Sequence, residues 1–281
     1  MAAGQYYKRV FNEKIFPRII LILMAFLFIL PFYWMIITAI KSLEELQQIP
    51  PTLIPRSFHW ENFVYAVNYI PFFRFLRNSL ILAVSSMIGA VISNSLVSYS
   101  VARINWKGRE QLFYVIVATM FLPFPVILVA VFDIFAKLRL INTFWPLILP
   151  SFMGSATHIF MMRQYLLSIP MEISDAGFID GANEWQIFTR LILPIMQPVI
   201  AVVAIFTALA AWSDFMGPLL YLQREELYPL SIGLQFFRSE HRVEYSQLMA
   251  ASTLVALPVV IMFLCFQRFF VEGITIGAMK G

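Results

Sequence analysis

Long apolar stretches constrain the fold of this chain more than any other feature of its sequence. A helix needs about 20 mostly apolar residues to cross the hydrocarbon core of a bilayer. Six segments meet this requirement, at residues 19–40, 79–102, 112–135, 144–165, 199–222 and 248–270. Because backbone polar groups in lipid must be bonded internally, the pattern predicts an all-α integral membrane protein with six transmembrane helices, forming a single domain over residues 1–281.

The composition excludes several classes of protein. Only 13% of the 281 residues are charged and 60% are apolar, whereas a soluble chain carries about twice that share of charge. The net charge of +4 is small, and basic residues cluster at the ends of apolar stretches, so no nucleic-acid partner is expected. The single cysteine, Cys265, lies in an apolar run, which excludes disulfides and cysteine metal sites within the chain.

The sequence contains no glycine-rich phosphate loop of the Walker type, so the chain cannot use ATP in that way by itself. No pairing of a nucleophile with a base indicates an intramembrane hydrolase either. We therefore expect a protein that is not an enzyme and that binds no cofactor or metal of its own.

The N-terminal region reads as a membrane anchor. Four basic residues between positions 8 and 18 precede the first apolar run, as they would in a signal peptide. The run is too long for a signal peptide, however, and no small-residue cleavage site precedes Lys41. We expect the segment to remain as a helix, kinked at Pro31.

Basic residues also predict the orientation in the membrane. The N-terminal group and the cluster Arg103, Lys107 and Arg109 mark cytoplasmic segments by the positive-inside rule. With six spans, both termini then lie in the cytoplasm. The polar segments 41–77 and 223–246 are placed outside.

Three of the predicted spans carry unusual residues. The second, 79–102, is rich in serine; these small hydroxyl side chains suit close helix packing, with a transport path as the alternative. The third contains Pro123 and Pro125, which break backbone hydrogen bonds and need protein or water beside them. In the fourth, His158 is interpreted as making a packing hydrogen bond, with a proton relay or ligand as the alternative.

A polar stretch, residues 169–198, interrupts the apolar pattern between the fourth and fifth spans. Its four acids, Glu172, Asp175, Asp180 and Glu184, cannot lie in hydrocarbon. Pro170 suits the first turn of a helix.

Within the stretch, Ile173, Ala176 and Ile179 recur at helical spacing and predict one apolar face.

One glycine divides this stretch into two short helices. Gly181 can take the left-handed conformation that closes a helix, and Asn183 can cap the next one, with Gln186 completing a capping box. An apolar stripe and a terminating proline follow in the second helix, at Trp185, Phe188, Ile192 and Pro194. The sequence predicts a helix–turn–helix outside the bilayer; the alternative is a helix lying on lipid, although such helices are usually basic.

An acid well inside the fifth predicted span identifies a candidate solute site. At 1.5 Å per residue, Asp214 lies about 22 Å along this span. A buried acid should face protein or a water-filled cavity. Together with Trp212, Ser213 and Phe215 it offers aromatic rings and oxygen acceptors suited to sugars. A helix–helix hydrogen bond with an interfacial tryptophan anchor explains the same residues equally well.

The polar stretch resembles the EAA loop of bacterial ABC importer permeases. Asp175-Ala176-Gly177 stands for Glu-Ala-Ala, Asp180-Gly181-Ala182 carries the motif glycine, and Ile192-Leu193-Pro194 closes the pattern. Asp175 and Gly177 depart from the usual residues, and glycine weakens a helix by about 1 kcal/mol relative to alanine. The resemblance implies that Glu172, the motif residues and Leu193-Pro194 dock as a short helix in a groove of an ATP-hydrolysing subunit.

Further motifs resemble the carbohydrate-uptake permeases of the maltose type, in particular the second permease of the pair. They are Pro31-Phe32-Tyr33-Trp34, Arg77-Asn78-Ser79, Tyr99-Ser100-Val101-Ala102-Arg103, Lys107-Gly108-Arg109, Asn142-Thr143, Trp212-Ser213-Asp214-Phe215, Pro229-Leu230, Gln267-Arg268-Phe269-Phe270 and Gly277-Ala278-Met279-Lys280-Gly281. Ser213 stands where that family usually has asparagine.

This resemblance implies a permease of the bacterial inner membrane that imports a sugar by alternating access. It also implies a heterodimer with a sister permease, two cytoplasmic subunits that bind ATP and Mg, and an extracytoplasmic binding protein toward which residues 223–246 reach. The alternatives are a self-contained secondary carrier, or an importer of a glycerol-phosphate-type solute. A carrier would be expected to hold its own coupling residues within its spans.

Overall fold

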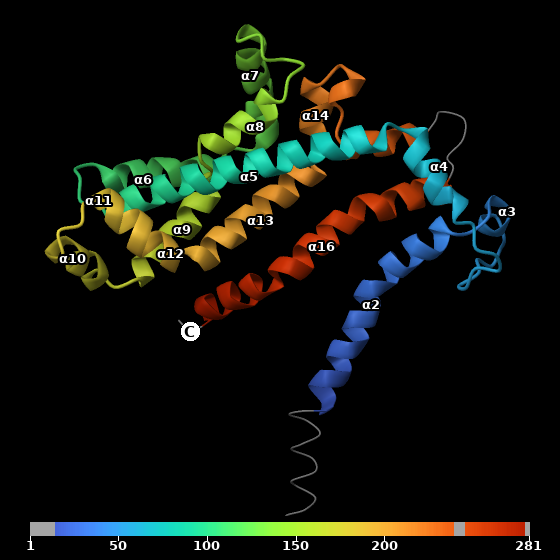
Figure 1. Ribbon diagram of the computed structural model, residues 1–281, viewed down its shortest axis with the longest axis horizontal. Coiled ribbons are helices and arrows are strands. Elements are labelled where there is room, and N and C mark those ends of the chain that lie inside the picture. The colour runs from blue at the N-terminus through green and yellow to red at the C-terminus, as the bar shows by residue number, and fades with distance from the viewer. Residues whose placement is uncertain (1–14, 239–244, 279–281) are drawn as a thin grey trace, which may run out of the picture. The chain divides into compact units, whose positions relative to one another are not determined.

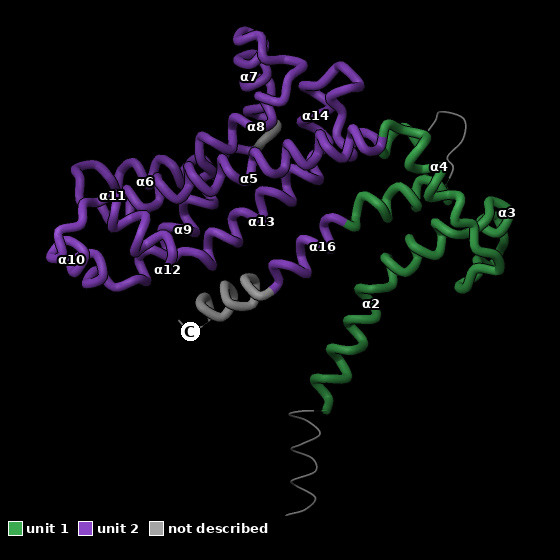
Figure 2. The backbone as a smooth tube through the Cα atoms, in the orientation of Figure 1, with its two compact units in different colours: residues 1–71, 234–257 green, residues 72–233, 258–281 purple. Residues whose placement is uncertain are grey.

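The computed structural model describes residues 15–238 and 245–278 (Figure 1). The basic residues at positions 8–14, part of the 223–246 segment and the last three residues lie outside this range. The chain divides into two compact units, residues 1–71 with 234–257 and residues 72–233 with 258–281 (Figure 2).

The first unit contains α2 (Phe16–Ala39), α3 (Leu43–Leu46), α4 (Glu61–Tyr69), the 3-10 turn η5 (Leu234–Phe237) and the first part of α16 (Tyr245–Ala278). The second unit contains α5 (Phe72–Ala102), α6 (Arg109–Ala118), η2 (Thr119–Phe121), α7 (Phe124–Lys137), α8 (Trp145–Phe152), α9 (Ala156–Ser168), α10 (Glu172–Ile179), α11 (Glu184–Gln186), η3 (Ile187–Ile192), α12 (Leu193–Ile195), α13 (Gln197–Ser213), α14 (Met216–Tyr221), η4 (Glu225–Leu227), α15 (Leu230–Gly233) and the rest of α16.

The predicted all-helical membrane character is confirmed, but the six-span prediction is met only in part. Among the described residues, α2, α5 and α16 are each long and apolar enough to cross a membrane. Two bent pairs could each form one more span: the helices on either side of residues 122–125, which meet at 105°, and α11–α12 with α13, which meet at 77°. The predicted fourth span is divided into α8 and α9.

Each break has a local cause. Pro123 is extended and separates η2 from α7, as its missing N–H and fixed φ predict. Gly154, with φ of +85°, turns the chain between α8 and α9. Asp214 is extended and ends α13, so the predicted fifth span is shorter than expected. In contrast, α2 remains helical through Pro31.

Helix α5 is the central element of the second unit and packs against α8, α9 and α13 (Figure 1). The Oδ1 atom of Asn94 accepts a hydrogen bond of 2.8 Å from the backbone N–H of Ser155, just before α9 begins. The Ser93 hydroxyl donates to the carbonyl of Ser151 at 2.9 Å. A ring carbon of Phe152 lies so close to Gly89 that a Cβ there would be 2.4 Å from it.

The serines of α5 agree with the packing interpretation. Five of them are buried in this unit, namely Ser79, Ser86, Ser93, Ser95 and Ser98. The expectation for His158 is not met at one ring atom, because its buried Nδ1 has no hydrogen-bond partner among the described residues.

Polar side chains also hold the segment that follows α14. Asn78, near the start of α5, donates to the carbonyls of Glu226 and Tyr228 at 2.8 and 3.0 Å. Asn142 accepts from the backbone N–H groups of Gln223 and Arg224 at 3.0 and 3.1 Å. Residues of separate sequence motifs thus meet around this segment and fix its backbone.

Helix α5 begins at residue 72, inside the predicted polar segment 41–77. The first part of that segment, which follows α2, folds around two buried charged side chains. The Glu45 carboxylate accepts from the Thr52 hydroxyl at 2.5 Å and from the Arg56 backbone N–H at 3.2 Å. The Lys41 ammonium donates to the carbonyl of Thr52 and lies 5.1 Å from the Trp34 ring. Lys41 and Glu45 are 2% and 4% exposed, so the loop depends on the hydrogen bonds that Thr52 and Arg56 make to them.

We predict that Glu45→Gln loosens this loop, because an amide N–H₂ would then face a backbone donor. Losing a hydrogen bond of a buried charged group costs about 1–3 kcal/mol. The measurement is the rate of pepsin cleavage within residues 47–58 of the purified chain, with Glu44→Gln, an exposed neighbour, as the matched control.

The rate of cleavage in this loop should also depend on pH, because the loop is stabilised by the ionised form of Glu45. The Thr52 hydrogen bond lowers the pKa of Glu45 below its usual 4.5, against the opposing effect of burial. A lowered pKa stabilises the loop above pH 4.5 and loses that stability as the pH falls through the folded-state value. The Glu44→Gln control keeps Glu45 and should follow the wild type. The ratio of the cleavage rate of Glu45→Gln to that of the control should therefore be largest at the highest pH tested and fall toward one on acidification, as Glu45 of the control loses its charge. A ratio that does not change with pH would contradict the prediction.

Candidate functional site

The short helix α10 forms the first half of the polar stretch. It begins at Glu172, with the backbone N–H of Asp175 donating to the carbonyl of Met171 at 3.1 Å. Pro170 lies before the helix rather than in its first turn, so the predicted start is two residues early. Glu172 and Asp175 lie in the first turn, where the positive end of the helix dipole favours carboxylates.

Gly181 closes α10 as predicted. Its φ is +79°, the left-handed region that side chains with a Cβ avoid. The N–H of Gly181 donates to the carbonyl of Phe178 at 3.0 Å, and that of Ala182 to Gly177 at 2.9 Å. These two bonds form a Schellman motif, which satisfies carbonyls at the helix end.

The predicted capping box after this turn is also confirmed. Asn183 Oδ1 accepts from the backbone N–H of Gln186, and Gln186 Oε1 accepts from the backbone N–H of Asn183, both at 2.9 Å. The box begins α11, so the turn between the two short helices is fixed on both sides.

The end of the second helix differs from the prediction. Pro194 does not stop it: a π-helical turn, η3, is followed by α12, and the chain stays helical through Ile195 before α13 begins at Gln197. Pro194 lies directly after the π-helical turn, at the second residue of α12. The wider π turn accommodates the proline without breaking the helix.

The face by which α10 packs on its own chain is formed by other residues than the predicted apolar face, which was assigned to a partner protein. Ser174 and Gly177 are the buried residues of the helix, whereas Ile179 is 86% exposed. Gly177 explains the difference, because a Cβ there would lie 2.9 Å from Leu191 Cδ1 and 3.1 Å from Ile187 Cγ1. Glycine at this motif position thus permits close packing of α10 on η3.

The exposed side of α10 combines apolar and acidic residues. We call it the α10 surface; it consists of Met171, Glu172, Asp175, Ala176, Phe178, Ile179 and Asp180, all exposed in this chain. Of the predicted stripe in the second helix, Phe188 and Ile192 are buried, whereas Trp185 is 63% exposed. The ring centroid of Trp185 nevertheless lies 5.7 Å from that of Phe188.

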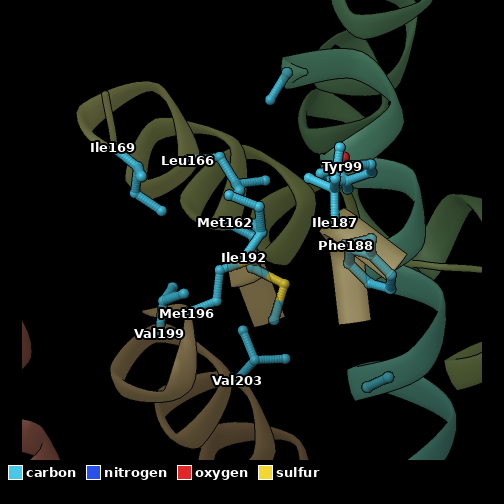
Figure 3. Packing of buried hydrophobic residues seen from close by; sticks show 12 residues of the cluster. Tyr99, Met162, Leu166, Ile169, Ile187, Phe188, Ile192, Met196, Val199 and Val203 are labelled. Carbon is cyan, nitrogen blue, oxygen red and sulfur yellow. The ribbon is translucent and has the colours of Figure 1, made fainter. Parts of the chain in front are cut away.

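The segment beneath the α10 surface is anchored in the main core of the second unit. Ile187, Phe188, Ile192 and Met196 are at most 4% exposed and join side chains of α5, α9 and α13 (Figure 3). Ala182 and Leu193 pack against the same cluster as partly buried residues, while Pro194 is exposed. Apart from Gly177, the motif residues on α10 are therefore exposed, while those that pack against the core, Ala182, Ile192 and Leu193, follow it.

Two side chains at the C-terminal end of α5, Tyr99 and Arg103, hold this segment, and the sequence analysis predicted this role for neither. The Tyr99 hydroxyl donates to Glu184 Oε2 at 2.7 Å, and its ring centroid lies 4.8 Å from that of Phe188. Arg103, 7% exposed, donates to carbonyls between α9 and α10. Burial lowers the pKa of Arg103, although arginine stays protonated in proteins. In the sequence, the one indication of a role for these two residues was the family motif that contains both, Tyr99-Ser100-Val101-Ala102-Arg103.

The residues of the second candidate site lie where α13 ends. Trp212 is 8% exposed and Ser213 donates to the carbonyl of Leu209 at 2.7 Å. Asp214 Oδ1 accepts from the backbone N–H of Gly217 at 3.0 Å, so this acid caps α14 instead of lying within a continuous helix. Asp214 and Phe215 remain partly exposed.

Neither candidate site is built as a metal centre. Among the described residues, no cluster of three or more histidine, cysteine, aspartate or glutamate side chains could hold a metal ion.

Comparisons with known proteins agree with the resemblance found in the sequence. The family described as "Binding-protein-dependent transport system inner membrane component" matches residues 94–275. The arabinooligosaccharides transport system permease protein AraQ of Halalkalibacterium halodurans is 32% identical, over 92% of this chain and 93% of its own. The trehalose/maltose transport system permease protein MalG of Thermococcus litoralis is 30% identical, over 96% and 99%.

A solved structure has the same fold. It is a bacterial ABC transporter involved in the import of the acidic polysaccharide alginate; the match covers 94% of this chain and 98% of the solved one, with a TM-score of 0.82 and 20% sequence identity. The family match spans more than half of the chain, and the relatives are matched over nearly their full length. The chain therefore belongs to the family of inner membrane components of binding-protein-dependent transport systems, the permeases of ABC importers.

Proposed function

We propose that this chain forms half of the translocation pathway for a mono- or oligosaccharide, as the second permease of a heterodimer. Its partners are a sister permease, two cytoplasmic subunits that bind ATP and Mg and hydrolyse the ATP, and an extracytoplasmic solute-binding protein. The names of the relatives, which specify arabinooligosaccharides and trehalose or maltose, support a sugar as the solute. Family membership also makes the secondary-carrier alternative unnecessary.

The α10 surface is the observation that carries the coupling part of the proposal. It presents Phe178 and Ile179 beside Asp175 and Asp180, on a helix whose two ends are fixed. An exposed amphipathic helix of this kind suits a groove in a partner protein. Its acidic charge argues against lipid, because interfacial helices are usually rich in lysine and arginine. We assign the groove to the ATP-binding subunit.

We predict that Gly181→Val uncouples ATP hydrolysis from uptake or weakens ATPase association. No atom lies within 4 Å of the Cβ position at Gly181, so the penalty is purely conformational, about 1–2 kcal/mol for a left-handed residue. Gly181→Asn is the matched control, because asparagine tolerates this conformation and should retain coupling. The measurements are solute uptake and solute-stimulated ATPase activity; normal values in Gly181→Val would refute the role of this turn.

Charge on the α10 surface provides an independent prediction. Asp175→Lys should weaken association with the ATP-binding subunit, more at low than at high ionic strength, since salt screens exposed charges. Glu225→Lys, an exposed acid of η4, reverses a charge elsewhere and should leave association unchanged. Pull-down of the ATP-binding subunit across a salt series measures the effect, and equal loss in both variants would point to net charge alone.

We further propose that Trp212, Ser213, Asp214 and Phe215 border the solute path. Asp214→Asn distinguishes this role from helix capping, because asparagine caps a helix as well as aspartate does but carries no charge. We predict altered relative uptake rates across a panel of sugars and glycerol 3-phosphate, with normal assembly. Asp133→Asn, an exposed acid paired with Lys137 at 2.6 Å, is the control. A wild-type profile for Asp214→Asn together with a defect in Asp214→Ala would leave capping as its role.

The orientation, with both termini in the cytoplasm of the bacterial inner membrane, is also a proposal. It rests on the basic segments at the N-terminus and at 103–109. Single cysteines at Gln47, Lys107 and Gln223, exposed positions on a Cys265→Ser background, should react with an impermeant reagent from outside only at Gln47 and Gln223. External labelling at Lys107 would invert the topology and remove α10 from the cytoplasm.

A further inference from the structure

Arg103 occupies an unusual position at the C-terminal end of α5. Its Nη2 donates to the carbonyls of Leu166 and Ile169 at 2.8 and 2.6 Å. Its Nη1 lies 3.3 Å from the carbonyl of Pro170 and 2.9 Å from the sulfur of Met171. One buried guanidinium therefore contacts four residues of a single six-residue stretch.

The acceptors are the groups that link α9 to α10. Helix α9 ends at Ser168 and α10 begins at Glu172, and the last carbonyls of a helix lack partners within it. Arginine suits this site because its planar fork of donors can reach several carbonyls at once, which a lysine ammonium on a flexible stem cannot reproduce. The bonds fix the direction in which the chain leaves α9 and enters α10.

A second bond holds the other side of α10 from the same turn of α5. Tyr99 lies four residues before Arg103, on the same face of the helix end. Its hydroxyl donates to Glu184, which follows the turn at Gly181. The C-terminal end of α5 is thus hydrogen-bonded to the chain both before α10, through Arg103, and after it, through Tyr99.

We propose that Arg103 is a positioning residue for coupling, which fixes α10 to the C-terminal end of α5 so that the two helices move as one body. The functional half of this inference rests on the proposed role of the α10 surface. The structural half concerns only this chain and can be tested without any partner.

Arg163 provides a matched control for the loss of a buried arginine. It is 8% exposed and lies on α9, but none of its hydrogen bonds is to the segment between α9 and α10. It donates to both carboxylate oxygens of Glu110 at 2.8 Å and its guanidinium lies 4.0 Å from the Phe113 ring. Its Nε also donates to the carbonyl of Val101 in α5 at 3.4 Å. Arg163→Lys therefore perturbs contacts with α6 and with the end of α5, but it removes none of the bonds from Arg103 to the link between α9 and α10.

The structural test measures the placement of α10 directly. Spin labels on cysteines at Ile92 and Ile179, which are 50% and 86% exposed, report the distance between α5 and α10 in the Cys265→Ser chain in lipid nanodiscs. We expect Arg103→Lys to broaden the distance distribution and Arg163→Lys to leave it unchanged. An unchanged distribution in Arg103→Lys, or equal broadening in both variants, would overturn the positioning role.

The functional test uses the assembled transporter, with ATP hydrolysed per solute imported as the readout. Arg103→Lys should raise this ratio severalfold at normal membrane abundance, while Arg163→Lys keeps the wild-type ratio. A broadened distribution with a normal ratio would keep Arg103 as the anchor of α10 but refute the coupling role of the α10 surface. Arg103→Gln, which keeps two donors, serves as a second variant. If neither variant assembles, Arg103 supports the whole fold and the specific inference is wrong.

Discussion

The need to satisfy every backbone polar group in hydrocarbon governs this structure. A continuous helix meets this need alone, but a chain that breaks its helices must find partners for the exposed groups. At the breaks in this chain, side chains bond the free backbone groups. Asn94 accepts from the N–H of Ser155 before α9, and Asp214 accepts from the N–H of Gly217 at the start of α14. The same logic places Arg103 on the carbonyls that end α9. Polar residues inside this membrane protein therefore serve mainly to permit turns in the backbone.

Helix α5 supplies most of these partners, and its length matters. Its 31 residues extend about 46 Å at 1.5 Å per residue, longer than the hydrocarbon core of about 30 Å. The helix is therefore longer than the apolar layer is thick. Asn78 near its start is bonded to the segment after α14, and Tyr99 and Arg103 at its other end are bonded to the segments that flank α10. Between them, small residues such as Gly89 let neighbouring helices approach closely.

Local chemistry was predictable from the sequence, and packing was not. The left-handed Gly181 and the Asn183–Gln186 box were predicted correctly, because each depends on a few adjacent residues. The packing of α10 on η3 through Ser174 and Gly177 was not predicted, since periodicity shows where apolar residues lie and not which face this chain covers. The role of Arg103 was missed because its acceptors lie at least 63 positions away. In the sequence it is one member of a basic cluster that already had an explanation in topology.

The two sides of α10 suit the coupling role that we propose for it. A helix that transmits force has to be rigid toward its own chain and exposed toward its partner. Gly177 meets the first need by allowing contact with Ile187 and Leu191, and interiors this closely packed transmit displacement instead of absorbing it. Ile179, 86% exposed, meets the second, because an apolar side chain left in water gains free energy when a groove covers it. The glycine that weakens α10 as an isolated helix is thus what allows it to pack closely on η3 within the protein.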